Sequence, residues 1–329
     1  PGDGTAASTT VVPMVNPDAD SGLDEHGESP FPDAHRPDRT YDLPAHGVRI
    51  AVHEWGSADA PALMMMHGGF DFARTFDGFA PKLAVAGWRV VSWDQRGHGN
   101  SAHAPLYSWD GDMRDTLAVF DYVAGGRPIP VVGHSKGGAL MTQLADAQPH
   151  RFRCLVNMDG IPYKRNIPDL AEHERTTMLA KDLAGWLDHR GRTATASRKP
   201  GTLDELAHRR GRMNPRLPHE WLRRLVTTGG FRSDDGWRWK IDPALRFGGF
   251  GPWRPEWMLM RLPGLPMPFL GILGAEMEEM GWGTPPHKVL PYMPIDGRCE
   301  VLDGVGHFVH IEQPDLVSRL VLDFVGAPA

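Results

Sequence analysis

Gly133-His134-Ser135-Lys136-Gly137 is the stretch of this chain that decides its fold. It follows the apolar run Pro128-Ile129-Pro130-Val131-Val132 and precedes the helix-forming run Gly138-Ala139-Leu140-Met141. Glycines on both sides allow the backbone to bend so tightly that larger side chains would collide. The pattern therefore predicts a strand, a sharp turn and a helix. The serine hydroxyl lies at the apex, where the first helical amides point at whatever it attacks.

Length and composition predict a large soluble globular protein. The chain has 329 residues, 41% hydrophobic and 23% charged, which suits one large domain or a domain with an insertion. Its apolar runs are too short to span a bilayer, and its start lacks the pattern of a signal peptide. We therefore expect a cytoplasmic protein with no membrane partner, either a monomer or a homodimer.

Metal, cofactor and nucleic-acid binding are not expected. Cys154 and Cys299 give no disulfide framework, and no histidines have metal-ligand spacing with carboxylates or thiolates. Phosphate-binding glycine patterns are missing as well. The densest basic stretch lacks interleaved aromatic residues and belongs to a chain of net charge −6, so we interpret it as a solvated helix face. That stretch is His208-Arg209-Arg210-Gly211-Arg212.

Three regions follow from the pattern along the chain. Residues 1–38 are rich in Pro, Asp, Gly, Ser and Thr, which predicts an extended or disordered arm. Residues 39–160 and 266–329 alternate apolar strands with helical patterns, which predicts a mostly parallel sheet flanked by helices. Residues 161–265 interrupt that rhythm and predict an inserted domain. The expected strands are 48–55, 62–66, 89–93, 128–132, 154–158, 268–274 and 299–302, and the expected helices are 72–86, 112–123 and 316–324.

Two further segments supply the groups that a nucleophilic serine needs, a base and donors for an oxyanion. His67-Gly68-Gly69-Phe70 follows the strand at 62–66, and its small residues leave amides free. We expect the amides of Gly69 and Lys136 to form the oxyanion hole. The segment Gly304-Val305-Gly306-His307-Phe308-Val309-His310 follows the last strand, so a histidine on it can reach over the sheet edge toward Ser135.

These segments, together with Asp94-Gln95-Arg96-Gly97-His98-Gly99, resemble the motifs of the α/β-hydrolase superfamily in order and spacing. The resemblance covers about residues 40–326. It implies an eight-stranded α/β fold with a mainly helical cap formed by the insertion, Ser135 as nucleophile and His307 as general base. His310 is a weaker alternative as base. His67, His98 and His134 lie beside the family's catalytic positions and are interpreted as structural, as is His310 when His307 is the base.

Two positions compete for the acid that orients the histidine. Many family members carry it after the strand beyond the insertion, where this chain has Met277 flanked by Glu276 and Glu278. A subgroup that includes haloalkane dehalogenases carries it one strand after the nucleophile, where Asp159 stands 24 residues past Ser135. The better match in place and spacing favours Asp159, with Glu276 as the alternative. A serine nucleophile disfavours alkyl halides and epoxides as substrates.

The predicted function is hydrolysis of a carboxylic ester or lactone. More than half of the chain's 11 tryptophans lie in the cap, which suggests a bulky, largely apolar or aromatic substrate, although tryptophans also pack small lids. Alternatives on the same scaffold are a C–C bond hydrolase or cofactor-independent oxygenase, and a ligand-binding receptor with a slow triad. The predicted substrate pocket comprises Phe70, Trp109, His134, Phe308, Trp186 and Trp253.

Overall fold

A central sheet carries all the segments that the sequence singled out. In a computed structural model, which describes residues 22–163, 172–245, 255–278 and 283–328, its strand order is β1-β2-β4-β3-β5-β6-β9-β10. The antiparallel pairs are β1–β2 and β2–β4, and the other pairs are parallel. The predicted eight-stranded, mostly parallel α/β-hydrolase sheet is confirmed. The strands are β1 (Arg39–Ala45), β2 (Val48–Trp55), β3 (Ala62–Met66), β4 (Arg89–Trp93), β5 (Ile129–His134), β6 (Phe152–Met158), β9 (Phe269–Gly274) and β10 (Arg298–Leu302).

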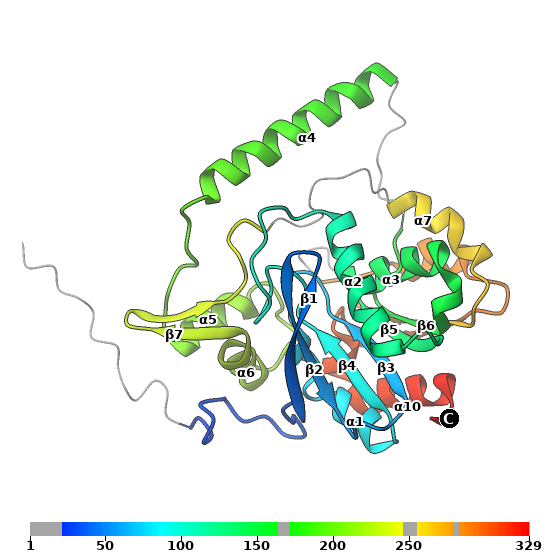
Figure 1. The fold of residues 1–329 in the computed structure, drawn as a ribbon, viewed down its shortest axis with the longest axis horizontal. Coiled ribbons are helices and arrows are strands. Elements are labelled where there is room, and N and C mark those ends of the chain that lie inside the picture. The colour runs from blue at the N-terminus through cyan, green and yellow to red at the C-terminus, as the bar shows by residue number, and fades with distance from the viewer. Residues whose placement is uncertain (1–21, 164–171, 246–254, 279–282, 329) are drawn as a thin grey trace, which may run out of the picture.

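Helices cover both faces of this sheet (Figure 1). In β3, Met64 and Met66 pack in the cluster that includes residues of α2 and α3, whereas Leu63 and Met65 pack in the cluster that includes residues of α1 and α10. This explains the unbroken apolar run, because a central parallel strand has no solvent face. The helices of the two layers are α1 (Ala80–Val85), α2 (Trp109–Ala124), α3 (Lys136–Ala147) and α10 (Pro314–Val325). Shorter pieces are η2 (Ala73–Phe76), η3 (Pro149–Arg151), η4 (Leu262–Gly264), α8 (Pro286–Val289), η5 (Leu290–Tyr292) and α9 (Val309–Glu312).

The single helix predicted over 72–86 is wrong. The structure divides it into η2 and α1. Between them, the Asp77 carboxylate is buried in ion pairs, and Gly78 packs beneath the ring of Trp221. Helix α1 then restarts with Pro81 in its first turn, where a missing amide proton costs nothing.

The insertion contains a hairpin that the sequence did not reveal. Strands β7 (Gly230–Ser233) and β8 (Gly236–Trp239) pair antiparallel around Asp234-Asp235, and Gly236 has a φ of +119° that favours glycine. The helices of the insertion are α4 (Glu172–Thr193), α5 (Leu203–Gly211), α6 (His219–Gly229) and α7 (Pro255–Arg261). Trp221 and Trp237 pack with Leu203 and Leu225 in an apolar cluster that also includes Phe72 and Phe308 from outside the insertion. These tryptophans therefore help to join the insertion to the rest of the molecule.

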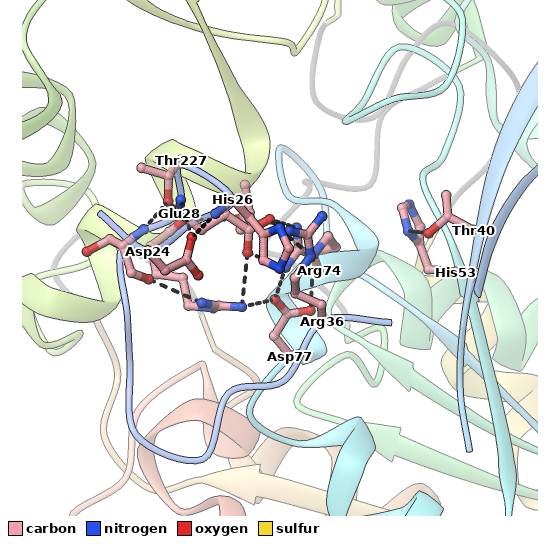
Figure 2. A network of polar contacts seen from close by, with 12 residues as sticks. Asp24, His26, Glu28, Arg36, Thr40, His53, Arg74, Asp77 and Thr227 are labelled. Atoms are coloured by element: carbon pink, nitrogen blue, oxygen red, sulfur yellow. Dashed lines mark hydrogen bonds and ion pairs between the residues drawn. The ribbon is translucent and has the colours of Figure 1, made fainter. Parts of the chain in front are cut away.

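The described part of the arm, residues 22–38, contains no helix or strand but is anchored by a buried ion network (Figure 2). Glu28 is 5% exposed and accepts two hydrogen bonds from Arg74, at 2.6 and 2.8 Å. Asp77 accepts from Arg74 and from Arg224 of α6, each at 2.6 Å. The network therefore ties three segments together: the arm, the loop before α1 and the cap.

Glu28 gives the test of this network. Burial acts to raise the pKa of Glu28, but the hydrogen bonds and charge of Arg74 outweigh it and hold that pKa below its usual 4.5. We expect Glu28→Gln to lower the free energy of unfolding by about 2 to 3 kcal/mol at pH 7, because charged hydrogen bonds to buried partners are lost. This stabilisation is complete above the unfolded-state pKa and disappears as the pH falls through the lower folded-state pKa. Urea denaturation at several pH values measures both effects.

Asp42→Asn is the matched control, because Asp42 pairs with Arg49 at 2.8 Å on the surface, where both side chains are about half exposed. It should change the free energy of unfolding by less than about 0.5 kcal/mol. A Glu28 variant as stable as this control would contradict the buried-network account.

Candidate active site

The turn at Ser135 is forced by close packing of backbone. Ser135 has a φ of +52°, which is rare for a residue with a side chain. A Cβ at Gly133 would lie 2.7 Å from the Cα of Gly138, and one at Gly137 would lie 2.5 Å from the carbonyl oxygen of Met66. Only glycine fits at these two positions. The turn therefore holds the serine at the joint between β5 and α3.

Ser135, His307 and Asp159 form one hydrogen-bonded chain. The Oγ of Ser135 lies 2.9 Å from Nε2 of His307, and Nδ1 of His307 lies 2.6 Å from Oδ2 of Asp159. The second oxygen of Asp159 accepts from the amide of Thr284 at 3.1 Å. Burial raises the pKa of the Asp159 carboxyl, and the His307 imidazole and the Thr284 amide act against that rise. The arrangement is that of a serine, a base and the group that orients the base.

The alternative acid, Glu276, does not reach the imidazole. Its side chain is exposed, and its backbone amide bonds to the carbonyl of Val305 at 3.0 Å. Its neighbour Glu278 is 6% exposed and accepts from the backbone amide of His307 at 3.3 Å. Glu278 therefore holds the loop that carries the histidine, a supporting contact that sequence spacing did not indicate. Geometry assigns the orienting position to Asp159.

The groups expected to form an oxyanion hole lie beside the serine. Gly69 lines the same pocket as Ser135 and His307. Lys136 is the first residue of α3, so its amide has no partner within the helix. The Lys136 side chain turns away to Asp112 of α2, with Nζ 2.6 Å from the carboxylate. Its ammonium group is thus neutralised while its amide stays at the site.

A second loop fixes the segment that follows Gly69. The amide of Phe70 donates to Nε2 of His98 at 3.2 Å, and Nε2 of His67 accepts from the amide of Gln95 at 2.9 Å. Asp94 accepts from the amide of Ala73 at 2.8 Å. These contacts give a physical role to the motif at 94–99. It holds the loop that presents the Gly69 amide.

Four further histidines around the site are buried and stay neutral near pH 7. Burial lowers the pKa of His67 to about 4 and of His310 to about 3, and it lowers the pKa of His98 and His134 well below the usual value. His134 donates from Nε2 to the carbonyl of His307 at 3.0 Å. The His310 ring packs against Phe76, with centroids 5.0 Å apart. Neither ring nitrogen of His310 has a hydrogen bond among the described residues, whereas His307 contacts Ser135 directly.

The lining of the pocket at Ser135 differs from that of the predicted aromatic pocket. Phe70, His134 and Phe308 line it as expected. Trp109 does not: it is 4% exposed in the core, where its Nε1 donates to Gln143. Trp186 lies on α4 and is not among the lining residues, and Trp253 lies outside the described residues. The other lining residues are Gly68, Asp71, Arg210, Met213 and Asn214.

Arg210 is an exception to the interpretation of the basic stretch as a solvated helix face, whereas His208 and Arg212 are exposed. Its side chain is 11% exposed, and its Nη1 donates to the carbonyl of Phe70 at 3.0 Å. Its neighbour Arg209 does face outward and bonds to the carbonyl of Pro200 at 2.8 Å. The helix turns successive arginines to different sides, so composition alone could not separate them.

The described residues contain neither a metal-binding cluster nor a membrane-spanning helix. No three His, Cys, Asp or Glu side chains gather there in a way that could hold a metal ion. None of the described helices has both the length and the hydropathy that a bilayer crossing needs.

Comparison with known proteins identifies the family. The family model described as serine aminopeptidase, S33, matches residues 58–239, which is more than half of the chain. The chain belongs to this family. It is therefore an α/β hydrolase of the serine hydrolase class, and the predicted superfamily is confirmed.

Individual relatives agree on the fold and differ in activity. A Bacillus subtilis (strain 168) protein provisionally named 2-succinyl-6-hydroxy-2,4-cyclohexadiene-1-carboxylate synthase is 27% identical over 85% of this chain and 95% of its own. The sn-1-specific diacylglycerol lipase ABHD11 of Mus musculus is 33% identical, but the match covers 32% of this chain and only 35% of the lipase. The thioesterase domain from the curacin biosynthetic pathway has a TM-score of 0.73 at 23% identity, over 87% of this chain and 99% of that domain.

The position of the acid is open to a direct test. We expect Asp159→Asn to lower kcat by about 10³ to 10⁴, because an amide cannot hold the imidazole in the required tautomer. Glu276→Gln is the matched control and should change kcat by less than about threefold, since its side chain contacts no member of the site. Steady-state kinetics on a p-nitrophenyl ester measures both variants. A larger loss from the Glu276 variant would overturn the assignment.

Proposed function

We propose that this protein hydrolyses a carboxylic ester or lactone of a bulky, largely apolar substrate through an acyl-enzyme on Ser135. The hydrogen-bonded chain from Ser135 through His307 to Asp159 is the observation that carries this proposal. Phe70, Met213 and Phe308 provide apolar pocket wall for the substrate. A lipase among the relatives supports acyl transfer as the reaction class, and the thioesterase domain shares the fold.

In the first half of the proposed reaction, the Oγ of Ser135 attacks the carbonyl carbon while Nε2 of His307 takes its proton. Asp159 accepts the hydrogen bond from Nδ1 and stabilises the resulting imidazolium. The amides of Gly69 and Lys136 donate to the oxyanion, a contact that strengthens as charge develops. The intermediate then collapses, and the leaving alkoxide takes the proton from His307.

In the second half, His307 removes a proton from water, and the hydroxide attacks the acyl-enzyme carbonyl. Collapse of the second intermediate returns the proton to Ser135 and releases the acid. For a lactone, both products form one hydroxy acid. No cofactor is needed for either half, because the nucleophile, base and oxyanion donors all come from the chain.

A fluorophosphonate probe tests the nucleophile. We expect one equivalent of the probe to label Ser135 alone, because only a serine beside a base and oxyanion donors is sufficiently nucleophilic. Ser135→Ala should remove the label with its far-ultraviolet circular dichroism unchanged. Ser318→Ala is the matched control and should keep full labelling, because Ser318 is buried in α10 and donates to the carbonyl of Asp315. Peptide mass spectrometry locates the label.

Labelling at a residue other than Ser135 would refute the proposed nucleophile. The two alternatives predict different results. A cofactor-independent oxygenase or C–C bond hydrolase would retain much of its activity in Ser135→Ala and lose it in His307→Ala. A receptor would bind its ligand, and from any ester or lactone in a panel it would release no more than one equivalent of product per protein.

A further inference from the structure

Asp71 places a buried carboxylate in the pocket beside Ser135, within ion-pair distance of Arg210 but without a hydrogen bond from any described residue. It is 2% exposed, and neither of its oxygens has a hydrogen bond among the described residues. The nearby Thr75 hydroxyl donates to the carbonyl of Phe72 at 2.8 Å instead. Burial raises the pKa of Asp71 to about 6, although the charge of Arg210 and the nearby Phe72 amide and Thr75 hydroxyl act against that rise.

Arg210 reaches the same pocket from α5 of the cap. Its Nη2 lies 3.7 Å from Oδ1 of Asp71, which is too far for a hydrogen bond, and its Nε has no hydrogen-bond partner among the described residues. The hydrogen bond from Nη1 to the carbonyl of Phe70 fixes the guanidinium in this position. The pocket wall therefore presents an unfilled acceptor and an unfilled donor side by side.

Such a pair is costly unless a ligand completes it. A buried polar group without a partner loses its hydration and gains nothing in return. Buried polar groups in folded proteins are nearly always paired, and the exceptions concentrate at functional sites. Asp71 and Arg210 both line the pocket that contains Ser135 and His307, so the missing partner belongs to whatever binds there.

We propose that Asp71 and Arg210 form a subsite for a neutral group that both donates and accepts hydrogen bonds, a hydroxyl or a primary amide on the substrate. This rests on the proposed function for the hydrolysis step only. The carboxylate accepts from the group and the guanidinium donates to it. Because the two charges offset each other, neither a carboxylate nor an ammonium group on the substrate gains a net favourable charge interaction there. The apolar remainder of the substrate contacts Phe70 and Phe308.

The test compares esters that differ only in this group. On the acyl side, p-nitrophenyl hexanoate is compared with the 6-hydroxyhexanoate and adipamate esters, and with the charged adipate and 6-aminohexanoate esters. The p-nitrophenyl esters of butyrate and 3-hydroxybutyrate make the same comparison with the hydroxyl closer to the ester carbonyl. On the alcohol side, hexyl butyrate is compared with 6-hydroxyhexyl butyrate.

We expect at least one neutral polar ester to exceed its alkyl analogue in kcat/KM by about tenfold to a hundredfold, because the analogue leaves the pair unfilled. In Asp71→Ala and in Arg210→Met, this ratio should fall to about one. Arg209→Met is the matched control and should keep the wild-type ratio, because Arg209 faces away from the pocket. Far-ultraviolet circular dichroism checks that each variant folds, because the Asp71 and Arg210 substitutions each leave one buried charge without its counter-charge.

Three results would overturn the proposal. These are a wild-type ratio near one for every pair, a ratio that persists in Asp71→Ala, or a preference for the adipate or 6-aminohexanoate ester. A binding measurement distinguishes failure of the subsite proposal from failure of the proposed hydrolase function. Calorimetric titration of Ser135→Ala with methyl 6-hydroxyhexanoate and methyl hexanoate should show the same selectivity without turnover, and Asp71→Ala in that background should remove it.

Discussion

The close approach of backbone at Gly133 and Gly137 is the constraint on which the site depends. A side chain at either position would collide with main-chain atoms of α3 or of the end of β3. That approach allows Ser135 its φ of +52°, a conformation that costs on the order of 1–3 kcal/mol and persists only where the surroundings enforce it. It brings the first amide of α3 close to the end of β3, where Gly69 follows. The nucleophile and both proposed oxyanion donors are therefore positioned by packing at one joint.

Buried polar contacts then connect this joint to the rest of the molecule. His98 and Asp94 hold the loop after Gly69 through backbone amides, and His134 holds the loop of His307 through a carbonyl. The histidines that do this are neutral because burial disfavours their protonated form. Farther away, Glu28, Arg74, Asp77 and Arg224 join the arm and the cap to the core. Rigid support of this kind preserves the hydrogen-bonding geometry that acyl transfer requires.

Sequence reasoning succeeded where local pattern dictates backbone. Apolar runs, flanking glycines and strand-end motifs were enough to predict the sheet. The resemblance to α/β hydrolases assigned Ser135 and His307 and ranked Asp159 above Glu276, but only the three-dimensional path of β6 and β9 shows which carboxylate reaches the imidazole. Contacts between cap and core were beyond prediction. Arg210 and Phe70 are 140 residues apart, and no periodicity indicates that one arginine of a basic helix turns into the pocket. The tryptophans of the insertion stayed ambiguous for a related reason, because the same side chain suits a packed interior and a substrate pocket equally well.

The central claim is that Ser135 carries the acyl group during turnover. The most direct measurement is intact-protein and peptide mass spectrometry of wild-type protein acid-quenched within milliseconds of mixing with p-nitrophenyl butyrate. The account predicts a butyryl adduct on Ser135 that forms with a stoichiometric burst of p-nitrophenol and decays at the turnover rate. Hydrolysis that depends on His307 and proceeds without any acyl adduct on Ser135 would contradict it.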